Sequence, residues 1–567
     1  MNGWLLTGTI VECTAGPPTR RTTTTITLTV RAVPKPPNPA TPTKSAPAST
    51  PGPEREPGST PAPEPIPIPP VLLPGPAPAP APPVVDQPPA DGIPAPTPEP
   101  GPAPAGGPSA ASEPASVTVA LRVHRWDGTR GPVLVSSAIP LRPGMLRPDD
   151  TARVRLRVGD TDVPVYVEAL RTRHADGSLR SVLVQTRGDH ADGTPATLTI
   201  GPRRTAPDLP RPERPGVPVA AALPTSPDYL VSTGIVGPTA TAAASAGAPG
   251  VAEWDAIWRG DAKWGGAPRH GPKGCDWHWK EEADAWGANF YDRAHSYLVM
   301  WARTGNPVYW HRGVRIAVGY RRGYVEQYNG ATPHWTQALG LLRHYQLTGD
   351  DASRAALQLI WDKAGWWSVP EHLGAAKSTD VENRIRARML QLQHVLWQLA
   401  DTHAERARLA ATLDASLAVA LGEQAADGRW PVQAAGNQPM PYMDGMLCDV
   451  LIDLHDGYRA DPRLVTVVRR TADDLWRRFR PAEGGMPYLE REVQPVGGTE
   501  VVPVLNALCV NALSWSHARG AGAVYRDRAD AFLVGAVKGV TPTNGKEFNQ
   551  LYNTAYKHLA YREGRTA

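Results

Sequence analysis

The chain has 567 residues, and its 59 lysines and arginines nearly balance its 55 aspartates and glutamates, leaving a net charge of +4. So small a charge gives no reason to expect nucleic acid or an anionic membrane surface as a partner. No apolar run approaches the ~18 residues of a membrane span. The four cysteines lie far apart in the sequence, so they predict neither a disulfide framework nor a paired-cysteine metal site.

Residues 1–33 are expected to form a short β attachment module. Thr22 to Val30 alternates polar and apolar side chains, which is the period of a strand, and a first strand around Trp4–Val11 is expected to pair with it. A lone hairpin is marginally stable, so this module is expected to need a partner or another copy. The opening residues lack a basic region followed by a long apolar one, and no signal peptide is predicted.

Residues 34–115 have the composition of a disordered linker. Of the chain's 63 prolines, 31 lie in this stretch. Such a segment cannot bury a core and favours extended polyproline II conformations. It would hold the rest of the chain away from whatever residues 1–33 attach to. An inert low-complexity tail is the alternative interpretation.

Residues 116–215 are predicted to form a small β-sandwich or barrel. Turn signals separate short segments of alternating polarity, at 117–123, 152–158, 163–167 and 181–185. No set of acidic and histidine side chains converges in this region. We therefore expect a supporting domain that packs against the next one.

Residues 216–567 read as a repeat of helical hairpins. In each of two hairpins an aromatic residue is followed by Thr-Gly and then Asn or Asp, with Gly305 and Gly349 ending the first helix and the next polar residue capping the second. Five or six such hairpins predict either an open solenoid or a closed toroid, of which we expect the (α/α) toroid, so the whole chain is expected to be multidomain α+β. The inner helices are expected near 288–303, 332–347, 380–400, 441–457, 500–518 and 547–562, and the outer ones near 307–323, 352–365, 404–424, 462–478 and 522–537.

The candidate site is the end of the ring where the inner helices begin. Parallel inner helices bring their N-termini together, and free N–H groups there favour anions. Polar or aromatic residues occur at almost every start, and the candidates are Tyr291, Asp292, His334, Trp335, Glu382, Asn383, Arg384, Arg388, Tyr442, Asp444 and Asn549. Trp277 and Trp279, in a run of six tryptophans between 254 and 286, are candidate sugar-stacking residues. Such a ring suits an acidic oligosaccharide as partner.

Each candidate also has a purely structural interpretation. Glu382 fits a capping box begun by Thr379, and Asp292 and Asp444 could be ordinary acids of a first helical turn. His334 follows a proline at a helix start and could be a half-buried ring with satisfied hydrogen bonds. Arg384 and Arg388 are harder to explain structurally, because a guanidinium on a largely apolar helix needs a partner. Cys275 and His278 have no second pair to complete a zinc site, and no cofactor is predicted.

A family resemblance is carried by three segments of the β region: residues 140–150 (Pro-Leu-Arg-Pro-Gly-Met-Leu-Arg-Pro-Asp-Asp), 163–165 (Val-Pro-Val) and 176–184 (Asp-Gly-Ser-Leu-Arg-Ser-Val-Leu-Val). They resemble the N-terminal β domain of the exo-rhamnogalacturonan lyase-like proteins, and Pro333-His-Trp followed by Leu347-Thr-Gly-Asp is similar to that family's second hairpin. The resemblance covers about residues 116–563 and implies a β domain followed by a toroid with a carbohydrate cleft. The N-terminal head and long proline linker outside it look like those of a phage tail or other virion-attached depolymerase, which implies a virion or extracellular location and tail proteins as partners of residues 1–33.

Two reactions fit these residues. In β-elimination Arg384 and Arg388 would bind the uronate carboxylate, His334 or Tyr291 would be the base, and Tyr442 the acid. In an inverting hydrolysis the acid and base would be Glu382 with Asp444 or Asp292. A binding or structural tail protein without catalysis is the third interpretation.

Overall fold

The computed structural model describes residues 6–9, 25–28, 116–205, 208–210, 213–260, 263–264, 267–268, 274–276, 279, 286–364, 382–430, 440–488, 500–541 and 545–566. The chain divides into two units, Met1–Pro104 and Ala105–Ala567. In the first, β1 (Leu6–Thr9) pairs antiparallel with β2 (Thr25–Leu28), as the alternation predicts. The predicted linker lies outside the described residues.

The β region of the second unit is a single eight-stranded sheet, with strand order β6-β5-β9-β3-β10-β4-β8-β7. The pairing is antiparallel throughout except between β10 and β4. The strands are β3 (Val117–Arg125), β4 (Val133–Pro140), β5 (Val154–Val158), β6 (Thr161–Asp162), β7 (Tyr166–Ala169), β8 (Ser181–Gly188), β9 (Pro195–Ile200) and β10 (Ala220–Pro224), and the 3-10 helix η1 (Pro148–Arg153) precedes β5.

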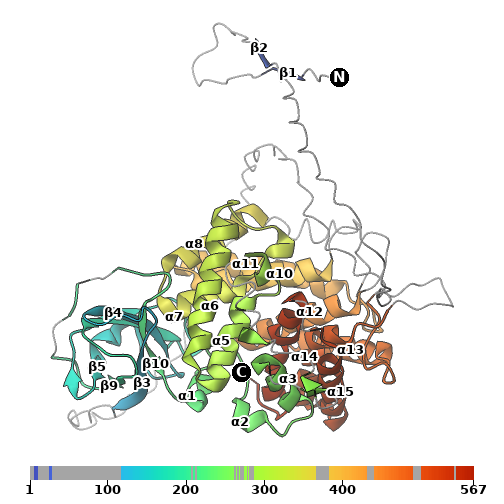
Figure 1. Cartoon of the computed structure of the whole chain (residues 1–567). Coiled ribbons are helices and arrows are strands. Elements are labelled where there is room, and N and C mark those ends of the chain that lie inside the picture. The colour runs from blue at the N-terminus through green and yellow to red at the C-terminus, as the bar shows by residue number, and fades with distance from the viewer. Residues whose placement is uncertain are drawn as a thin grey trace, which may run out of the picture. The chain divides into compact units, whose positions relative to one another are not determined.

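This sheet differs from the sandwich or barrel that the sequence predicts, because it curls on itself without a second sheet to face (Figure 1). The helical ring covers the outer face instead. On β8, Val182 and Val184 join the core inside the curl, whereas Leu183 between them packs with helical residues. Because successive side chains of a strand point to opposite faces, β8 contributes side chains to two different hydrophobic cores.

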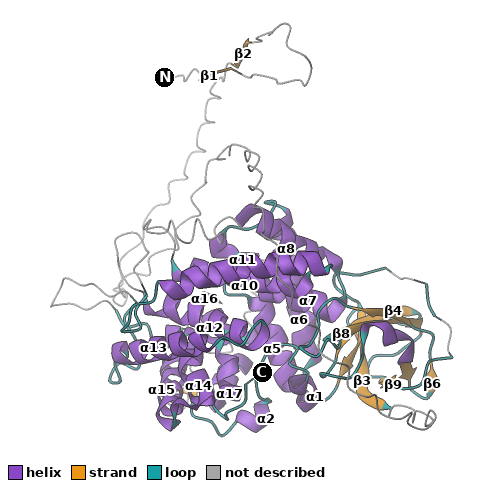
Figure 2. Cartoon of the chain, turned by 180° about the vertical axis from the view of Figure 1, so that it is seen from behind, coloured by secondary structure: helices purple, strands orange, loops and turns teal. Residues whose placement is uncertain are grey.

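The helical region is built from hairpins whose helices match the predicted ranges closely. The inner helices are α5 (Arg293–Thr304), α7 (Ala338–Thr348), α10 (Asn383–Leu399), α12 (Pro441–Gly457), α14 (Val510–Ser516) and α16 (Gly545–Asn553) with α17 (His558–Tyr561). The outer helices are α6 (Pro307–Tyr320), α8 (Asp351–Ala364), α11 (His403–Gly422), α13 (Pro462–Arg478) and α15 (Ala523–Gly539). Figure 2 shows these helices beside the sheet.

Shorter elements precede or interrupt these helices. Three differ from the sequence prediction: the segments 332–336 and 503–508 are 3-10 turns, η4 (Pro333–Trp335) and η7 (Pro503–Leu508), and the last inner helix is broken by η9 (Ala555–Lys557). The remaining elements are α1 (Pro227–Ser232), α2 (Ala242–Ser245), α3 (Val251–Arg259), β11 (Lys263–Trp264), β12 (Ala267–Pro268), η2 (Trp286–Asn289), η3 (Arg321–Glu326) and η8 (His517–Ala521).

The ring of inner helices closes on itself. Each inner helix contacts the next, and α16 returns to contact α5. Asn549 on α16 donates Nδ2 hydrogen bonds to the carbonyl oxygens of Ala288 and Phe290, at 2.8 Å each. The outer partner of α16 is α3, whose Trp254 and Trp258 pack against Tyr552. The sixth pair thus joins the beginning of the helical region to its end.

The two ends of the ring are connected differently. At one end each inner helix passes to its outer partner through a few residues, with Gly305 and Gly349 at φ 71° and the side chains of Asn306 and Asp461 capping α6 and α13. At the other end, outer helices return through segments that include 365–381, 431–439 and 489–499, which lie outside the described residues. The predicted glycine stop and Asn cap are confirmed for the first hairpin.

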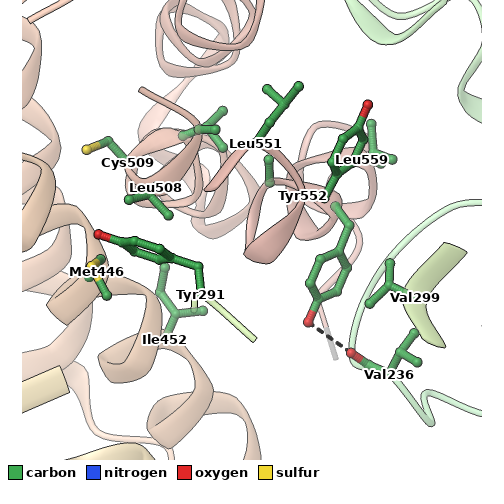
Figure 3. Close-up of a cluster of buried hydrophobic side chains, with 14 of the residues drawn as sticks. Val236, Tyr291, Val299, Met446, Ile452, Leu508, Cys509, Leu551, Tyr552 and Leu559 are labelled. Atoms are coloured by element: carbon green, nitrogen blue, oxygen red, sulfur yellow. Dashed lines mark hydrogen bonds between the residues drawn. The ribbon is translucent and has the colours of Figure 1, made fainter. Parts of the chain in front are cut away.

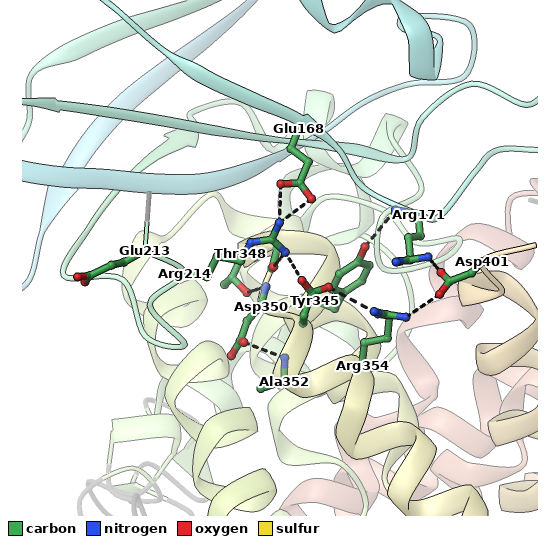
Figure 4. Close-up of polar contacts among 12 residues, drawn as sticks. Glu168, Arg171, Glu213, Arg214, Tyr345, Thr348, Asp350, Ala352, Arg354 and Asp401 are labelled. Atoms are coloured by element: carbon green, nitrogen blue, oxygen red, sulfur yellow. Dashed lines mark hydrogen bonds and ion pairs between the residues drawn. The ribbon is translucent and has the colours of Figure 1, made fainter. Parts of the chain in front are cut away.

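The sheet is fixed to the ring by a polar interface (Figure 4). Arg214 binds Glu168 of β7 and, on the ring, Asp351 and the carbonyl oxygen of Gly349. Arg171 pairs with Asp401, which also binds Arg354. These contacts hold two segments of the β region, the loop after β7 and the segment before β10, against the C-terminal ends of α7 and α10. None of the described helices is both long and apolar enough to cross a bilayer.

Candidate active site

The candidate residues gather where the inner helices begin, and a charged triad occupies the centre of the group. His334, in η4, shares a hydrogen bond of 2.7 Å between its Nε2 and Oε1 of Glu382. Arg384 donates from Nη2 to both oxygens of the same carboxylate, at 2.7 and 3.0 Å. The His334 side chain remains 46% exposed, whereas Glu382 and Arg384 are 15% exposed. The imidazole of His334 is therefore exposed to solvent, and the less exposed ion pair of Glu382 and Arg384 lies behind it.

Glu382 stands at the N-cap of α10 but does not cap it through its side chain. Thr379, with which the sequence predicts a capping box, lies outside the described residues, so that interpretation stays a prediction. Burial raises the pKa of the carboxyl group, and the bonds from His334 and Arg384 outweigh that effect and lower the pKa to about 2. Glu382 is ionised at neutral pH and serves to orient two cationic or proton-binding groups.

Arg388 lies one turn further into the ring and is fully enclosed. Its guanidinium group stands 5.0 Å from the ring centre of Phe290 and 5.5 Å from that of Tyr291. Among the described residues no carboxylate oxygen lies within 4.0 Å of it, and its Nη1 atom makes no hydrogen bond. Burial lowers its pKa to about 10, so the group keeps its charge at neutral pH. A buried cation in this state favours an anion beside it.

Two tyrosines complete the wall around Arg384. Tyr291 is 1% exposed and lies beside Met446 and Leu508 (Figure 3), with its backbone at φ 64° in the left-handed region. Tyr442, in the first turn of α12, stacks on Tyr488 at 5.5 Å between ring centres. Burial raises the pKa of Tyr442, with the Tyr291 hydroxyl adding to the effect, so its hydroxyl remains a proton donor at neutral pH.

Asn383 and Asp444 form a buried pair next to the triad. Asn383 donates from Nδ2 to Oδ1 of Asp444 at 2.7 Å. The other carboxylate oxygen lies 3.8 Å from Nη1 of Arg478 on the outer helix α13. Asp444 is thus held between an amide and a cation and is 5% exposed.

Asp292 caps one inner helix and binds the backbone of the next, which is the structural role that the sequence allows for it. At the N-cap of α5 it accepts a hydrogen bond from the backbone N–H of His295, and its Oδ2 accepts one of 2.9 Å from the N–H of Gly340 on α7. Burial raises its pKa to about 6, against the lowering effect of these backbone bonds. The side chain therefore ties two inner helices together.

The proposed stacking residues have different environments. Trp335 contacts Trp286, Phe290 and Tyr324 and is partly buried at the edge of a core cluster. Trp279 lies beneath the guanidinium groups of Arg312 and Arg315. Asn549 is 1% exposed and its amide closes the ring, so a direct role in substrate binding is not supported by its geometry. Trp277 lies outside the described residues.

The sequence did not single out Phe290, Met440 or Tyr488, which the structure places around the site. Phe290 forms the face on which Arg388 rests, and Tyr488 comes from the segment after α13 to stack on Tyr442. Phe290 carried a signal, since it is one of only 4 phenylalanines and precedes Tyr291. No sequence signal pointed to Tyr488, because Tyr442, against which it packs, lies 46 residues away in the sequence.

The cluster thus brings together one imidazole, one ionised carboxylate, two guanidinium groups and two phenol hydroxyl groups. Next to Tyr291, Asp292 and Arg388 the described residues enclose a cavity of about 30 Å³, the size for a water molecule. In the described part of the chain, no cluster of three or more His, Cys, Asp or Glu side chains is arranged to hold a metal ion.

Comparison with known proteins gives weak likenesses. The sequence matches no protein-family model and no curated protein sequence. A polysaccharide lyase aligns with 55% of this chain and 98% of its own at 11% identity and a TM-score of 0.40. A glycosyl hydrolase of family 88 from Bacteroides vulgatus gives the same identity and score over 55% of this chain and 99% of its own. An α-1,6-mannanase variant of Salegentibacter sp., solved with α-1,6-mannotriose, gives 12% identity over 49% of this chain and 89% of its own, with a TM-score of 0.36. Likenesses at these scores establish neither a fold nor an activity for this chain.

Proposed function

We propose that the protein cleaves an acidic polysaccharide by β-elimination at the N-terminal end of the inner ring. The observation that carries the proposal is Arg388, a buried cation with no carboxylate oxygen within 4.0 Å among the described residues and with Asp292 as a more distant electrostatic partner, set beside a partly exposed histidine. β-Elimination requires a cation at the uronate carboxylate, a base for the proton α to that carboxylate, and an acid for the departing oxygen. All three kinds of group lie within this cluster.

In this proposal His334 is the base. If its Nε2 carries the hydrogen that binds Glu382, the lone pair of Nδ1 is free to accept the substrate's proton. The ionised Glu382 stabilises the imidazolium that forms. Arg388 and Arg384 neutralise the carboxylate, which lowers the energy of the carbanion-like transition state. Tyr442, protonated at neutral pH, gives its proton to the leaving oxygen, and water then restores it.

The alternative hydrolysis fits these environments less well. An inverting hydrolase needs one carboxylic acid that is protonated and reaches the glycosidic oxygen. Glu382 has a pKa of about 2, and Asp292, whose pKa is raised to about 6, is 3% exposed and occupied as a helix cap. Asp444 is held by Asn383 and lies near Arg478. We therefore favour elimination over hydrolysis.

The test is incubation with a panel of uronate-containing polysaccharides and a neutral glucan, with the product examined for the ultraviolet absorbance of an unsaturated uronate. We expect that absorbance with at least one acidic glycan and none with the glucan. Reducing ends without the absorbance would replace elimination by hydrolysis. Tight binding of a glycan without any product would replace both by the binding role.

A further inference from the structure

A second cavity, of about 720 Å³, lies at the opposite end of the ring. Its walls come from the first half of α7 (Leu339 and Arg343), from the C-terminal halves of α10 and α12, from η9 and α17, and from residues 173–180 and 231–239. It therefore lies between the ring and the loops of the sheet. Leu339, Gln391 and Val450 separate it from the small cavity of the candidate active site. Its volume is within the range of natural small-molecule sites.

The lining carries an excess of positive charge. Arg173, Arg180, Arg343 and Arg406 all face this cavity, and in the described part of the chain none of them has a carboxylate oxygen within 4.0 Å. Burial lowers the pKa of Arg180 to about 10 and also lowers those of Arg173 and Arg343. These guanidinium groups are charged at neutral pH and poorly solvated, which is a costly state without an anion.

The carboxylates of the same wall are already occupied. Asp453 accepts a hydrogen bond of 2.6 Å from Nζ of Lys557, which also binds Asp449. Asp456 is bound by Arg519 at 2.5 Å and by the indole nitrogen of Trp515 at 3.1 Å. The negative charge on the wall is therefore paired closely with other cations, and it acts on the arginines only at longer range, as Asp453 does on Arg343.

The arginines are held in position by neutral partners. Arg343 donates from Nη1 to Oε1 of Gln346 at 2.7 Å, and Gln346 in turn donates to Oγ1 of Thr172 at 3.0 Å. Arg180 donates from Nε to the carbonyl oxygen of Arg173 at 2.9 Å. Nε of Arg343 is buried and makes no hydrogen bond to the described residues, and Nε2 of the neighbouring His394 is buried with the backbone of Gly457 close to its ring. Guanidinium groups that are held in place and still have unused N–H donors are well suited to bind an oxyanion.

We propose that this cavity is a second binding site, distinct from the catalytic one, for a small oxyanion such as a sugar acid or a phosphate. Arg343 and Arg180 bind the anionic group, and His394 offers its ring nitrogen to the same ligand. Trp397 also lines the cavity, with the guanidinium group of Arg406 over its ring. Both components, sheet and ring, supply ligands, so the bound anion would also strengthen their contact.

The experiment is calorimetric titration of the full chain with glucuronate, inorganic phosphate and neutral glucose. We expect both anions to bind one site in this cavity and glucose not to bind; in the Arg384→Gln protein, which lacks one of the proposed uronate contacts of the active site, the stoichiometry should be 1:1. Arg343→Gln and Arg180→Gln should each weaken the anion about 10- to 100-fold, the loss of one charge-assisted hydrogen-bonding group. Arg343→Lys, which keeps the charge, should retain part of the affinity. Tighter binding of glucuronate indicates a sugar acid, and tighter binding of phosphate indicates a phosphorylated ligand.

Two control variants test whether anion binding belongs to this cavity. Arg408→Gln changes an exposed arginine on the same helix as Arg406 and should leave anion binding unchanged. Arg384→Gln changes the candidate active site and should leave binding here unchanged even if it abolishes cleavage. The proposal is overturned if neither anion binds at about 10 mM, if glucose binds equally, or if folded Arg343→Gln and Arg180→Gln proteins bind like the unsubstituted chain.

Discussion

Glu382 shows how one residue can organise a site through charge alone. It accepts hydrogen bonds from a cation and an imidazole at the same carboxylate, and neither bond caps its helix. The pKa of about 2 means that the folded state binds this proton less tightly than the unfolded chain, where the value is near 4.5. Its contribution to stability is therefore present above about pH 4.5 and is lost as the pH falls toward 2.

Glu382→Gln should consequently be less stable than the unsubstituted chain at pH 7, by about 1–2 kcal/mol after allowance for solvent screening of a partly exposed group. The difference should shrink at pH 3. Urea unfolding at the two pH values measures it. Glu213→Gln, at an exposed glutamate outside this cluster, is the matched control. An equal loss for Glu382→Gln at both pH values would mean that packing, not charge, accounts for its role.

Arg388 is the residue whose replacement best separates catalysis from structure. As the group that neutralises a uronate, it should contribute about 2–4 kcal/mol in the transition state, so Arg388→Gln should lose about 30- to 1000-fold in kcat/KM. Because no carboxylate oxygen of the described residues lies within 4.0 Å of the group, and Asp292 acts on it only from further away, the melting temperature should change little. Kinetics beside a thermal melt test this. A large fall in melting temperature with cleavage intact would assign Arg388 to the fold.

At the scale of elements, the inner helices are joined by side chains at their ends as well as by packing. Asp292 caps α5 and binds the N–H of Gly340 on α7. A Cβ atom at position 340 would lie 2.3 Å from Oδ1 of Asp292, so only glycine allows this approach. The start of one helix therefore fixes the position of the next.

Asp292→Ala should cost about 2–3 kcal/mol, because it removes a cap and leaves the Gly340 N–H unpaired. Asp292→Asn keeps the acceptor and should fold nearly normally. Its pKa of about 6, raised from 3.8 by burial, means that the unsubstituted chain loses stability as the pH rises from about 4 to about 6. The free energy of unfolding of the Asp292→Asn protein, relative to that of the unsubstituted chain, should therefore rise by about 1–3 kcal/mol across that range. Denaturant titrations at pH 4 and 7 measure the change, and a constant difference would contradict it.

At the scale of the whole molecule, segments that are far apart in the sequence pack together to close the ring and to line the second cavity. The last inner helix closes on the segment before the first, and α3 supplies its outer partner. Loops of the sheet form one wall of the second cavity. All three core clusters lie between Val119 and Tyr561, within the unit that begins at Ala105.

Asn549→Ala tests the closure of the ring. The substitution leaves two carbonyl oxygens without their buried donor and should lower the free energy of unfolding by about 2–4 kcal/mol. Activity per folded molecule should be preserved, because the Asn549 amide stabilises the closed ring and does not contact the substrate in this proposal. Loss of substrate affinity with stability intact would return Asn549 to the substrate-binding role that its sequence position suggested.

Removal of residues 1–115 tests the division of the chain. We expect the chain starting at Ser116 to keep its melting temperature and its cleavage activity, since the described cores lie beyond that point. Limited proteolysis of the full chain should release the same fragment. Only a function that residues 1–33 carry themselves should be lost. Scattered cleavage through 251–567 would contradict a single ring.

The sequence by itself determined the helical repeat, because glycine stops, polar caps and apolar periodicity are local signals. It placed α5 to α15 within a few residues of their observed bounds, apart from the 3-10 turns, and it gathered most candidate residues at one end of the ring. It also found the strand period in β3, β5 and β8, but it could not determine that one curled sheet forms without a second, since that depends on which face the ring covers.

Only the tertiary structure decided which charges meet. Glu382 finds His334 across 48 residues, and Asn549 reaches Ala288 across 261. The cavity of Arg180, Arg343 and His394 has no sequence signature at all, because its residues come from three separate elements. A motif requires fixed spacing along the chain, whereas electrostatic partners are selected by proximity in space, which is set when the ring closes and the sheet packs against it.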